Sequence, residues 1–215
     1  MRESSGQLKQ SRELRSGAAQ RSPAALFLRQ FLSAPGQIGA IAPSSIHLAR
    51  RMMENFDFES VRAVAEFGPG AGVFTQELLS RVQPGTKVII IEKNPVMAAE
   101  VRRRFPQLQI HETSAEDIAD VCVKEGLPAQ GGLDAIISGL PFAAFPDSLQ
   151  DAILGAAVSA LRPGGWFVTF AYYQGLALPA GRRFAAKLPR YFRTVERSRG
   201  VLRNLPPAFV YRCST

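Results

Sequence analysis

A carboxylate followed by three glycines is the segment of this sequence best suited to holding a small ligand. Glu66 precedes Gly68, Gly70 and Gly72 in the run EFGPGAG. Glycines let the backbone turn tightly and approach a ligand closely. In dinucleotide-binding loops the third glycine comes three positions after the second, but here that position is Val73. Because Glu66 would repel a pyrophosphate and attract a cation, we predict a site for a positively charged small molecule.

A second acidic side chain, Glu92, ends the next apolar run, and Lys93 follows it. A carboxylate at the end of the second strand of such a sheet can accept hydrogen bonds from both hydroxyls of a ribose. We therefore predict that Glu92 and Lys93 line the same ligand site. The alternative is a solvated charge at a strand end.

A short polar segment, TSAED, follows the third apolar run at residues 113–117. An adenine base would lie at this point of such a sheet, beside a small residue, so Ala115 and Glu116 are candidate contacts. Ser114 could equally be the N-cap of the next helix, because serine side chains accept hydrogen bonds from helix N-terminal amides.

A further candidate segment, SGLPF, spans residues 138–142 after the fourth apolar run. Ser138 and Leu140 fall where open α/β sheets bind ligands, and backbone carbonyls there can orient a substrate amine. Phe142 can present a ring face to a cationic nitrogen or a sulfonium. The alternative for Phe142 is an aromatic plug of the core.

Alternating strand and helix patterns must position these segments. The patterns predict strands at 61–65, 87–91, 108–111, 133–137 and 166–172, helices at 73–81, 94–105, 116–125 and 146–161, and two further strands within 190–213. Such alternation predicts an α/β fold with a seven-stranded, mainly parallel sheet and helices on both faces. Two helices, at about 22–32 and 44–56, precede it.

Composition limits the class of protein and of partner. The chain has 215 residues and a net charge of +8, which suits one domain and anionic partners. Two cysteines and two histidines, Cys122, Cys213, His47 and His111, lack metal-ligand spacing, so we expect no metal site. The uncharged stretches 30–49 and 163–181 contain prolines and glycines that argue against membrane-spanning helices.

Basic residues gather at both ends of the chain. We expect a disordered basic tail at 1–21, N-terminal helices at 22–56 that cap the substrate site, and a catalytic domain at 57–215. Phe27, Leu28, Phe31 and Leu32 form an apolar stripe that could lie on an anionic membrane, where each nearby basic residue contributes ~1 kcal/mol. The alternative is that this stripe packs on the domain and the arginines are solvated.

The glycine loop, the acidic strand end and the Leu-Pro-aromatic segment together resemble class I S-adenosylmethionine-dependent methyltransferases, which have a Rossmann-like fold. Within that class the chain looks most like bacterial phospholipid N-methyltransferases, through the stretches 38–45, 66–75, 136–146 and 204–210. The resemblance implies S-adenosylmethionine as cofactor, S-adenosylhomocysteine as product, and contacts at Glu66, Gly68, Gly70 and Glu92. Ser114 stands where many relatives have aspartate.

The resemblance also implies a reaction and a location. The reaction is N-methylation of phosphatidylethanolamine, and of its mono- and dimethyl forms, toward phosphatidylcholine, on the cytoplasmic face of the membrane. The acceptor amine must lose a proton, and Tyr172, Tyr173 or a glutamate could help; we take Tyr173 and Phe142 as candidate catalytic residues. The oligomeric state stays open.

Two other functions fit parts of the sequence. The related rRNA adenine dimethyltransferases carry Asn-Leu-Pro-Tyr, but Gly139 occupies the asparagine position here. Because glycine has no side chain to hold an adenine amino group, we do not expect a nucleic-acid substrate. A catalytically inactive binding protein would need a broken cofactor site, whereas Glu66, the glycines and Glu92 are intact.

Overall fold

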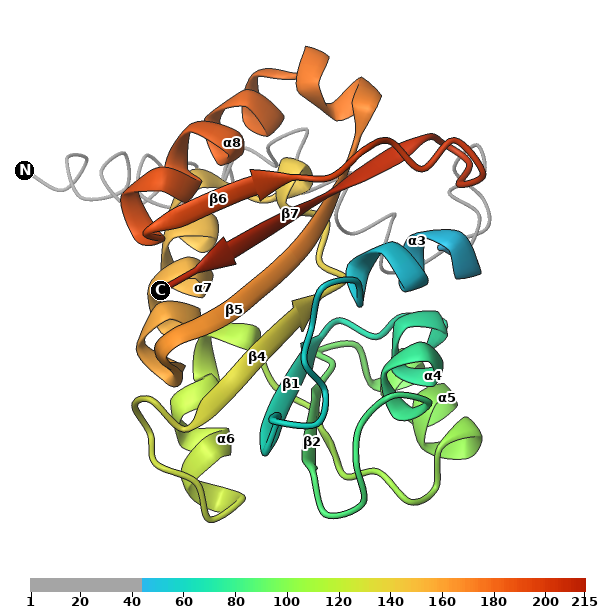
Figure 1. The fold of residues 1–215 in the computed structure, drawn as a ribbon, viewed down its shortest axis with the longest axis vertical. Coiled ribbons are helices and arrows are strands. Elements are labelled where there is room, and N and C mark those ends of the chain that lie inside the picture. The colour runs from blue at the N-terminus through green and yellow to red at the C-terminus, as the bar shows by residue number, and fades with distance from the viewer. Residues whose placement is uncertain (1–43) are drawn as a thin grey trace, which may run out of the picture.

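The computed structural model describes residues 44–215, so the predictions for the basic tail and the first amphipathic helix lie outside the described residues. A seven-stranded sheet has the order β3-β2-β1-β4-β5-β7-β6 (Figure 1). The first five strands are parallel, and β7 runs antiparallel to both β5 and β6. The strands are β1 Ala63–Phe67, β2 Lys87–Ile91, β3 Ile110–His111, β4 Leu133–Ser138, β5 Leu161–Tyr172, β6 Thr194–Arg197 and β7 Ala208–Ser214.

Helices cover both faces of this sheet, as predicted. They are α3 Ile46–Met52, α4 Val73–Leu79, α5 Pro95–Arg104, α6 Ile118–Lys124, α7 Asp147–Ala160 and α8 Pro179–Tyr191, with 3₁₀ turns η1 Ala115–Asp117, η2 Phe142–Ala144 and η3 Tyr173–Ala177. Side chains cap the first turns of two of these helices. The Ser45 side chain accepts from the amide of Leu48, and the Asn94 side chain accepts from the amide of Val96.

Two apolar layers hold the helices on the sheet. On one face, Ile136 and Phe167 of the strands pack with buried side chains of α6, α7 and α8. On the other face, Val64 and Ile137 pack with buried side chains of α3 and α4, and a third cluster seats α5 on β2. Because successive strand residues point to opposite faces, β1, β4 and β5 supply apolar side chains to both layers.

The structure corrects several predicted elements, among them the strands predicted at 166–172 and 108–111, which are β5 at Leu161–Tyr172 and β3 at Ile110–His111. The strand predicted at 61–65 is β1 at Ala63–Phe67, and Glu66 lies inside it, where it pairs with Ile90 of β2 and Ile137 of β4. The second predicted helix ends at Met52 instead of near Phe56, since the chain turns through a positive φ at Asn55. The helix α8 was not predicted, and its last residues, Arg190 and Tyr191, fall in the segment 190–213 for which strands are predicted.

The carboxyl ends of the parallel strands meet at one edge of the sheet. The strand order reverses between β1, which leads to β2, and β4, which lies on its other side. Open α/β sheets bind ligands in the crevice beside such a reversal. All four predicted site segments follow parallel strands, so the fold brings them to this edge. Among residues 44–215, no helix is both long enough and apolar enough to span a bilayer.

Candidate active site

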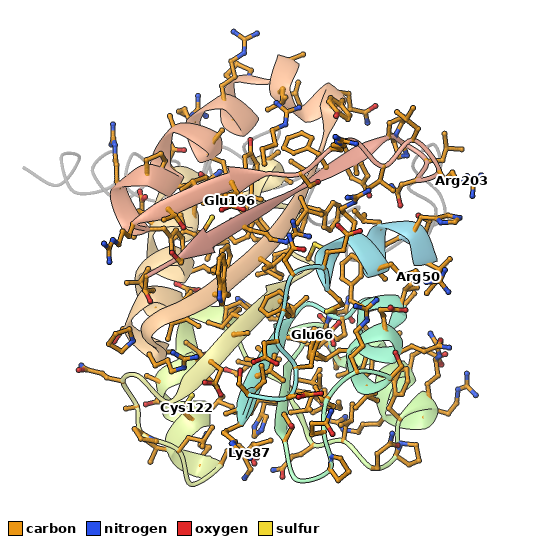
Figure 2. The ribbon with its side chains drawn as sticks, in the orientation of Figure 1. Arg50, Glu66, Lys87, Cys122, Glu196 and Arg203 are labelled. Carbon is orange, nitrogen blue, oxygen red and sulfur yellow. The ribbon has the colours of Figure 1, made fainter. Side chains whose placement is uncertain are left out.

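Glu66 is a fully buried carboxyl group beside the strand-order reversal (Figure 2). Neither of its carboxyl oxygens has a hydrogen-bond partner among the described residues. Burial raises the pKa of Glu66 to about 8, the hydroxyl and amide of Thr75 lower it in part, and the charge of Glu92 raises it. Thr75 thus faces the carboxyl group, although its hydroxyl is not within hydrogen-bond geometry. A buried carboxyl without a partner is costly, so it suits a site completed by a cation.

The glycine loop leaves bare backbone next to Glu66. Gly68, Gly70 and Gly72 have φ of 65°, 52° and 76°, a region that glycine adopts without strain. A Cβ added to Gly70 would meet nothing within 4 Å, so the loop is open at that point. Gly72 is the N-cap of α4, and the guanidinium of Arg104 donates to the carbonyl of Ala71 and so fixes the loop from α5.

The loop after β4 packs directly against the glycine loop. The Gly139 amide donates to the Phe67 carbonyl at 2.8 Å, and a Cβ on Gly139 would overlap the Gly68 carbonyl oxygen. A Cβ on Gly68 would in turn lie 2.7 Å from Cδ2 of Leu140. The predicted residues Gly68 and Leu140 are therefore in contact, and the absence of side chains at two positions makes this contact possible.

Glu92 lies close to the same place. It is 7% exposed, and its Oε1 accepts from the Asn94 amide at 2.9 Å. Burial raises its pKa, while the amides of Asn94, Gly70 and Lys93 lower it in part. The structure therefore brings Glu92 to the glycine loop, whereas the side chain of Lys93 is exposed. The predicted ribose contact stays a prediction.

The segment after β3 is organised as a helix start. Ser114 is the N-cap of η1, its side chain donates to Glu116 Oε2 at 2.8 Å, and Asp117 closes a capping box. Ala115 is buried behind this turn, and Glu116 is exposed. The alternative role of Ser114 as a helix cap is thus present, and contacts of Ala115 and Glu116 with adenine stay predictions.

Phe142 belongs to an aromatic cluster in the core. It is 2% exposed, and its ring stacks on Phe184 of α8 with centroids 4.4 Å apart. Phe145 and Phe167 approach its edges. This packing is that of the aromatic plug considered above, and a contact between Phe142 and a cation stays a prediction. Ser138, at the end of β4, is fully buried.

Tyr173 lies just past the carboxyl end of β5. Its side chain is 40% exposed, its amide donates to the Pro207 carbonyl, and its ring packs on Phe209 and under the guanidinium of Arg197. Burial raises the pKa of the neighbouring Tyr172 to about 12, so Tyr172 is a poor proton acceptor at neutral pH.

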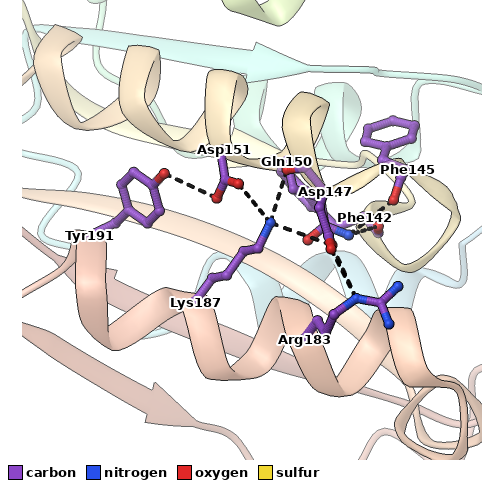
Figure 3. A network of polar contacts seen from close by, with 8 residues as sticks. All are labelled: Phe142, Phe145, Asp147, Gln150, Asp151, Arg183, Lys187 and Tyr191. Atoms are coloured by element: carbon purple, nitrogen blue, oxygen red, sulfur yellow. Dashed lines mark hydrogen bonds and ion pairs between the residues drawn. The ribbon is translucent and has the colours of Figure 1, made fainter.

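Sequence reasoning missed Gln150, which supports the loop after β4 (Figure 3). Its Nε2 donates to the carbonyls of Phe142 at 2.8 Å and Phe145 at 3.2 Å and so closes the turn η2. The available signal was a polar residue on an apolar stripe, since Gln150 shares the buried face of α7 with Ile153, Leu154, Ala157 and Ala160.

Ion pairs tie α8 to α7 beside this turn (Figure 3). The Lys187 ammonium donates to the Asp151 carboxylate at 2.9 Å, and the Tyr191 hydroxyl donates to the same carboxylate. Arg183 forms an ion pair with Asp147. Exposed pairs of this kind contribute little singly. The packing of the buried Phe184 and Leu188 therefore holds α8 on the core, and the ion pairs add to it beside Phe142.

Comparisons with known proteins agree with this geometry. Residues 64–165 match the model of a methyltransferase domain. The ornithine lipid N-methyltransferase of Singulisphaera acidiphila is 31% identical over 191 residues, which cover 87% of this chain and 94% of that protein. The dimethyladenosine transferase of Yarrowia lipolytica is 32% identical over 95 residues, 44% of this chain and 28% of that protein. The O-methyltransferase TomG from Streptomyces achromogenes, solved with S-adenosylmethionine, shares the fold at TM-score 0.61, 17% identity and 96% coverage of both chains.

The fold, the glycine loop and these similarities define a class I S-adenosylmethionine-dependent methyltransferase. Within that class, the chain belongs to the family of the ornithine lipid N-methyltransferase, with which it aligns over most of both lengths.

The described residues fit S-adenosylmethionine. The unpaired Glu66 carboxyl can receive the ammonium group of its methionine part, and the open backbone at Gly70 allows close approach. Glu92 follows β2, the place at which sheets of this kind carry a carboxylate that accepts hydrogen bonds from the ribose hydroxyls.

Proposed function

We propose that this protein transfers a methyl group from S-adenosylmethionine to the primary amine of a membrane lipid. The similarity to a lipid N-methyltransferase over 87% of the chain is the observation that carries the proposal. The unpaired carboxyl of Glu66 supports it, because an intact cofactor site argues against an inactive binding protein.

The chain's residues would act mainly by binding and orientation. S-adenosylmethionine, when bound, supplies a methyl group already activated by a sulfonium. Glu66 and the glycine loop hold the donor, and the loop 138–142 holds the acceptor against it. Alignment of this kind supplies up to ~7–11 kcal/mol of the barrier reduction in favourable cases. The acceptor amine, with a pKa of ~10, must also lose a proton to water. We propose that the hydroxyl of Tyr173, a residue 40% exposed, relays it by accepting the amine proton while donating its own to water.

The acceptor lipid is the finer part of the proposal. The sequence resemblance suggested phosphatidylethanolamine, with methylation continuing toward phosphatidylcholine, whereas the relative is named for ornithine lipid. Both lipids present a primary amine near the membrane surface. The net charge of +8 supports binding to an anionic leaflet, and we propose that the protein works on the cytoplasmic face of the membrane.

Methylation of rRNA adenine is the rival function, favoured by the partial match to a dimethyladenosine transferase. Contacts at Gly139 argue against it. The Asn-Leu-Pro-Tyr motif has asparagine at the position of Gly139. In this structure even a Cβ at Gly139 would overlap the Gly68 carbonyl oxygen, so an asparagine side chain does not fit.

A radiolabelled methyl-transfer assay tests the proposal. Vesicles containing phosphatidylethanolamine, vesicles containing ornithine lipid, and rRNA are offered separately, with Glu66→Ala as the cofactor-site control. We expect label in one or both lipids, none in rRNA, and none with the variant. Label in rRNA alone would replace the lipid proposal with the RNA one.

A further inference from the structure

Exposed apolar side chains are concentrated on the ligand-binding edge of the sheet. Among the described residues, seven large apolar side chains are at least 40% exposed: Ile46, Val96, Val123, Tyr173, Leu178, Leu202 and Leu205. Six of them, all except Val123, either follow the carboxyl end of a strand or lie in a segment that packs beside that edge of the sheet. Val123 lies at the opposite edge, close to Glu125, whose carbonyl accepts from Lys87 at the start of β2.

The two most exposed of these side chains belong to the loop 198–207 between β6 and β7. Leu202 is 78% exposed and Leu205 is 71% exposed. The loop is nevertheless anchored, because Val201 is buried and pairs with Ala208. Ala208 in turn pairs with Tyr172, the last residue of β5, so the loop stands at the carboxyl edge.

Asn204 joins this loop to α3. Its side chain is 2% exposed, Oδ1 accepts from the Ser45 amide at 2.8 Å, and Nδ2 donates to the Pro206 carbonyl at 2.7 Å. Ile46, the first residue of α3 and 40% exposed, is thereby held next to the loop. The leucines are presented by a fixed turn rather than by a free tail.

Positive charge surrounds these apolar side chains. Arg199 and Arg203 lie in the loop, Arg50 lies on α3, and all three are exposed without an ion pair within residues 44–215. Figure 2 shows Arg50 and Arg203 directed outward on the same side of the molecule. From Arg197 to the end of the sequence there is no aspartate or glutamate.

We propose that Ile46, Leu202 and Leu205, with Arg50, Arg199 and Arg203 around them, form a docking surface for an anionic lipid bilayer. The leucines would enter the interface while the arginines meet lipid phosphates. Aliphatic rather than aromatic tips favour a bilayer over single-stranded RNA, whose bases stack on aromatic rings. The inference rests on the proposed lipid substrate and adds to it, since docking by this edge turns the cofactor crevice toward the lipid headgroups.

Flotation with vesicles tests the surface in the full-length protein. The test variant carries Leu202→Glu and Leu205→Glu, and the matched control carries Val123→Glu, an equally drastic change at a 60% exposed valine on the opposite edge. Vesicles contain phosphatidylglycerol and phosphatidylcholine, or phosphatidylcholine alone. We expect the double variant to lose about tenfold or more in binding to the anionic vesicles, and the control to bind like the wild type. Equal flotation of all three proteins would overturn the proposal.

Activity separates this surface from the proposed function. The wild type and both variants are assayed on phosphatidylethanolamine or ornithine lipid in anionic vesicles, and on dihexanoyl phosphatidylethanolamine as dissolved monomers. We expect the double variant to lose activity on vesicles only. If the double variant loses flotation and the wild type methylates neither lipid, the docking surface is supported and the proposed function is rejected. An effect on rRNA binding with unchanged flotation would assign the loop to RNA and reject the surface.

Discussion

The Gly68 carbonyl oxygen occupies the space that a side chain on Gly139 would need. The loops after β1 and β4 therefore meet backbone to backbone, with the Gly139 amide donating to the Phe67 carbonyl. This contact sets the position of the glycine loop relative to Leu140, which packs on Gly68.

Gly139→Ala is expected to push these two loops apart and to weaken cofactor binding by about tenfold or more, since a displacement near a binding site is costly. The matched control is Gly155→Ala in α7, where a Cβ would meet nothing within 4 Å and alanine favours the helix. Calorimetric titration with S-adenosylhomocysteine measures the affinity. Equal affinities for the two variants would mean that the loop contact does not shape the site.

Glu66 is expected to make the ligand-free protein less stable as pH rises. Its pKa is about 8 when folded and near 4.5 when unfolded, so the folded chain holds one more proton between these values. Its contribution to stability is present below about pH 4.5 and is lost as pH rises toward 8, at up to about 1.4 kcal/mol per pH unit. Glu66→Gln should remove this slope, and Glu59→Gln, an exposed control, should retain it. Urea unfolding of the wild type and both variants between about pH 5 and 8 measures how the free energy of unfolding depends on pH.

Cofactor binding is expected to release a proton near neutral pH. Glu66 is mostly protonated below about pH 8 in the free protein, and an ammonium group beside it would favour the carboxylate. The affinity should therefore rise between about pH 5 and 7, and the heat of binding should differ between buffers of different ionisation enthalpy. Buffer-independent heats would indicate that Glu66 is not the partner of the ammonium group.

Local signals explain which parts of the fold the sequence predicted. The helix predicted at 94–105 is α5, with Asn94 as its N-cap and Pro95 as its first residue, and the apolar run predicted as a strand at 87–91 is β2. The helix α8 was missed because Gly181 and Pro189 are usually read as helix breakers. Gly181 is in fact required, since a Cβ there would overlap the Gly175 carbonyl oxygen. Packing of Phe184 and Leu188 on the core, which no local pattern reveals, stabilises the helix.

The site was predicted less completely for the same reason. Residue type alone was enough to select the acidic residues and glycines at the ends of the strands or just after them: Glu66, Gly68, Gly70 and Glu92. Contacts between distant segments, such as Gln150 with the turn η2, depend on how α7 packs and have only the weak signal of a polar residue in an apolar stripe.

Gln150→Leu is expected to destabilise the protein by about 1–3 kcal/mol, because the carbonyls of Phe142 and Phe145 would lose the buried bonds from Gln150, and the Phe142 carbonyl would keep only the Phe145 amide as donor. Methyl transfer should fall as well, since η2 follows the loop that carries Leu140. The control is Gln76→Leu, on the exposed side of α4. Urea unfolding and initial rates measure the two effects. A stability equal to that of the control would show that water replaces the amide.

Tyr173→Phe is expected to lower kcat by roughly tenfold or more while leaving cofactor affinity unchanged, if its hydroxyl assists proton removal from the acceptor amine. The change keeps the ring contacts with Phe209 and Arg197, so packing is preserved. Tyr172→Phe is the matched control, because burial raises the pKa of that hydroxyl to about 12 and it should not accept a proton at neutral pH. Rates are compared from pH 7 to 9, where a proton-transfer defect should lessen as more of the amine is already neutral. A uniform loss across this range would assign Tyr173 to substrate positioning, and an unchanged kcat would remove it from the reaction.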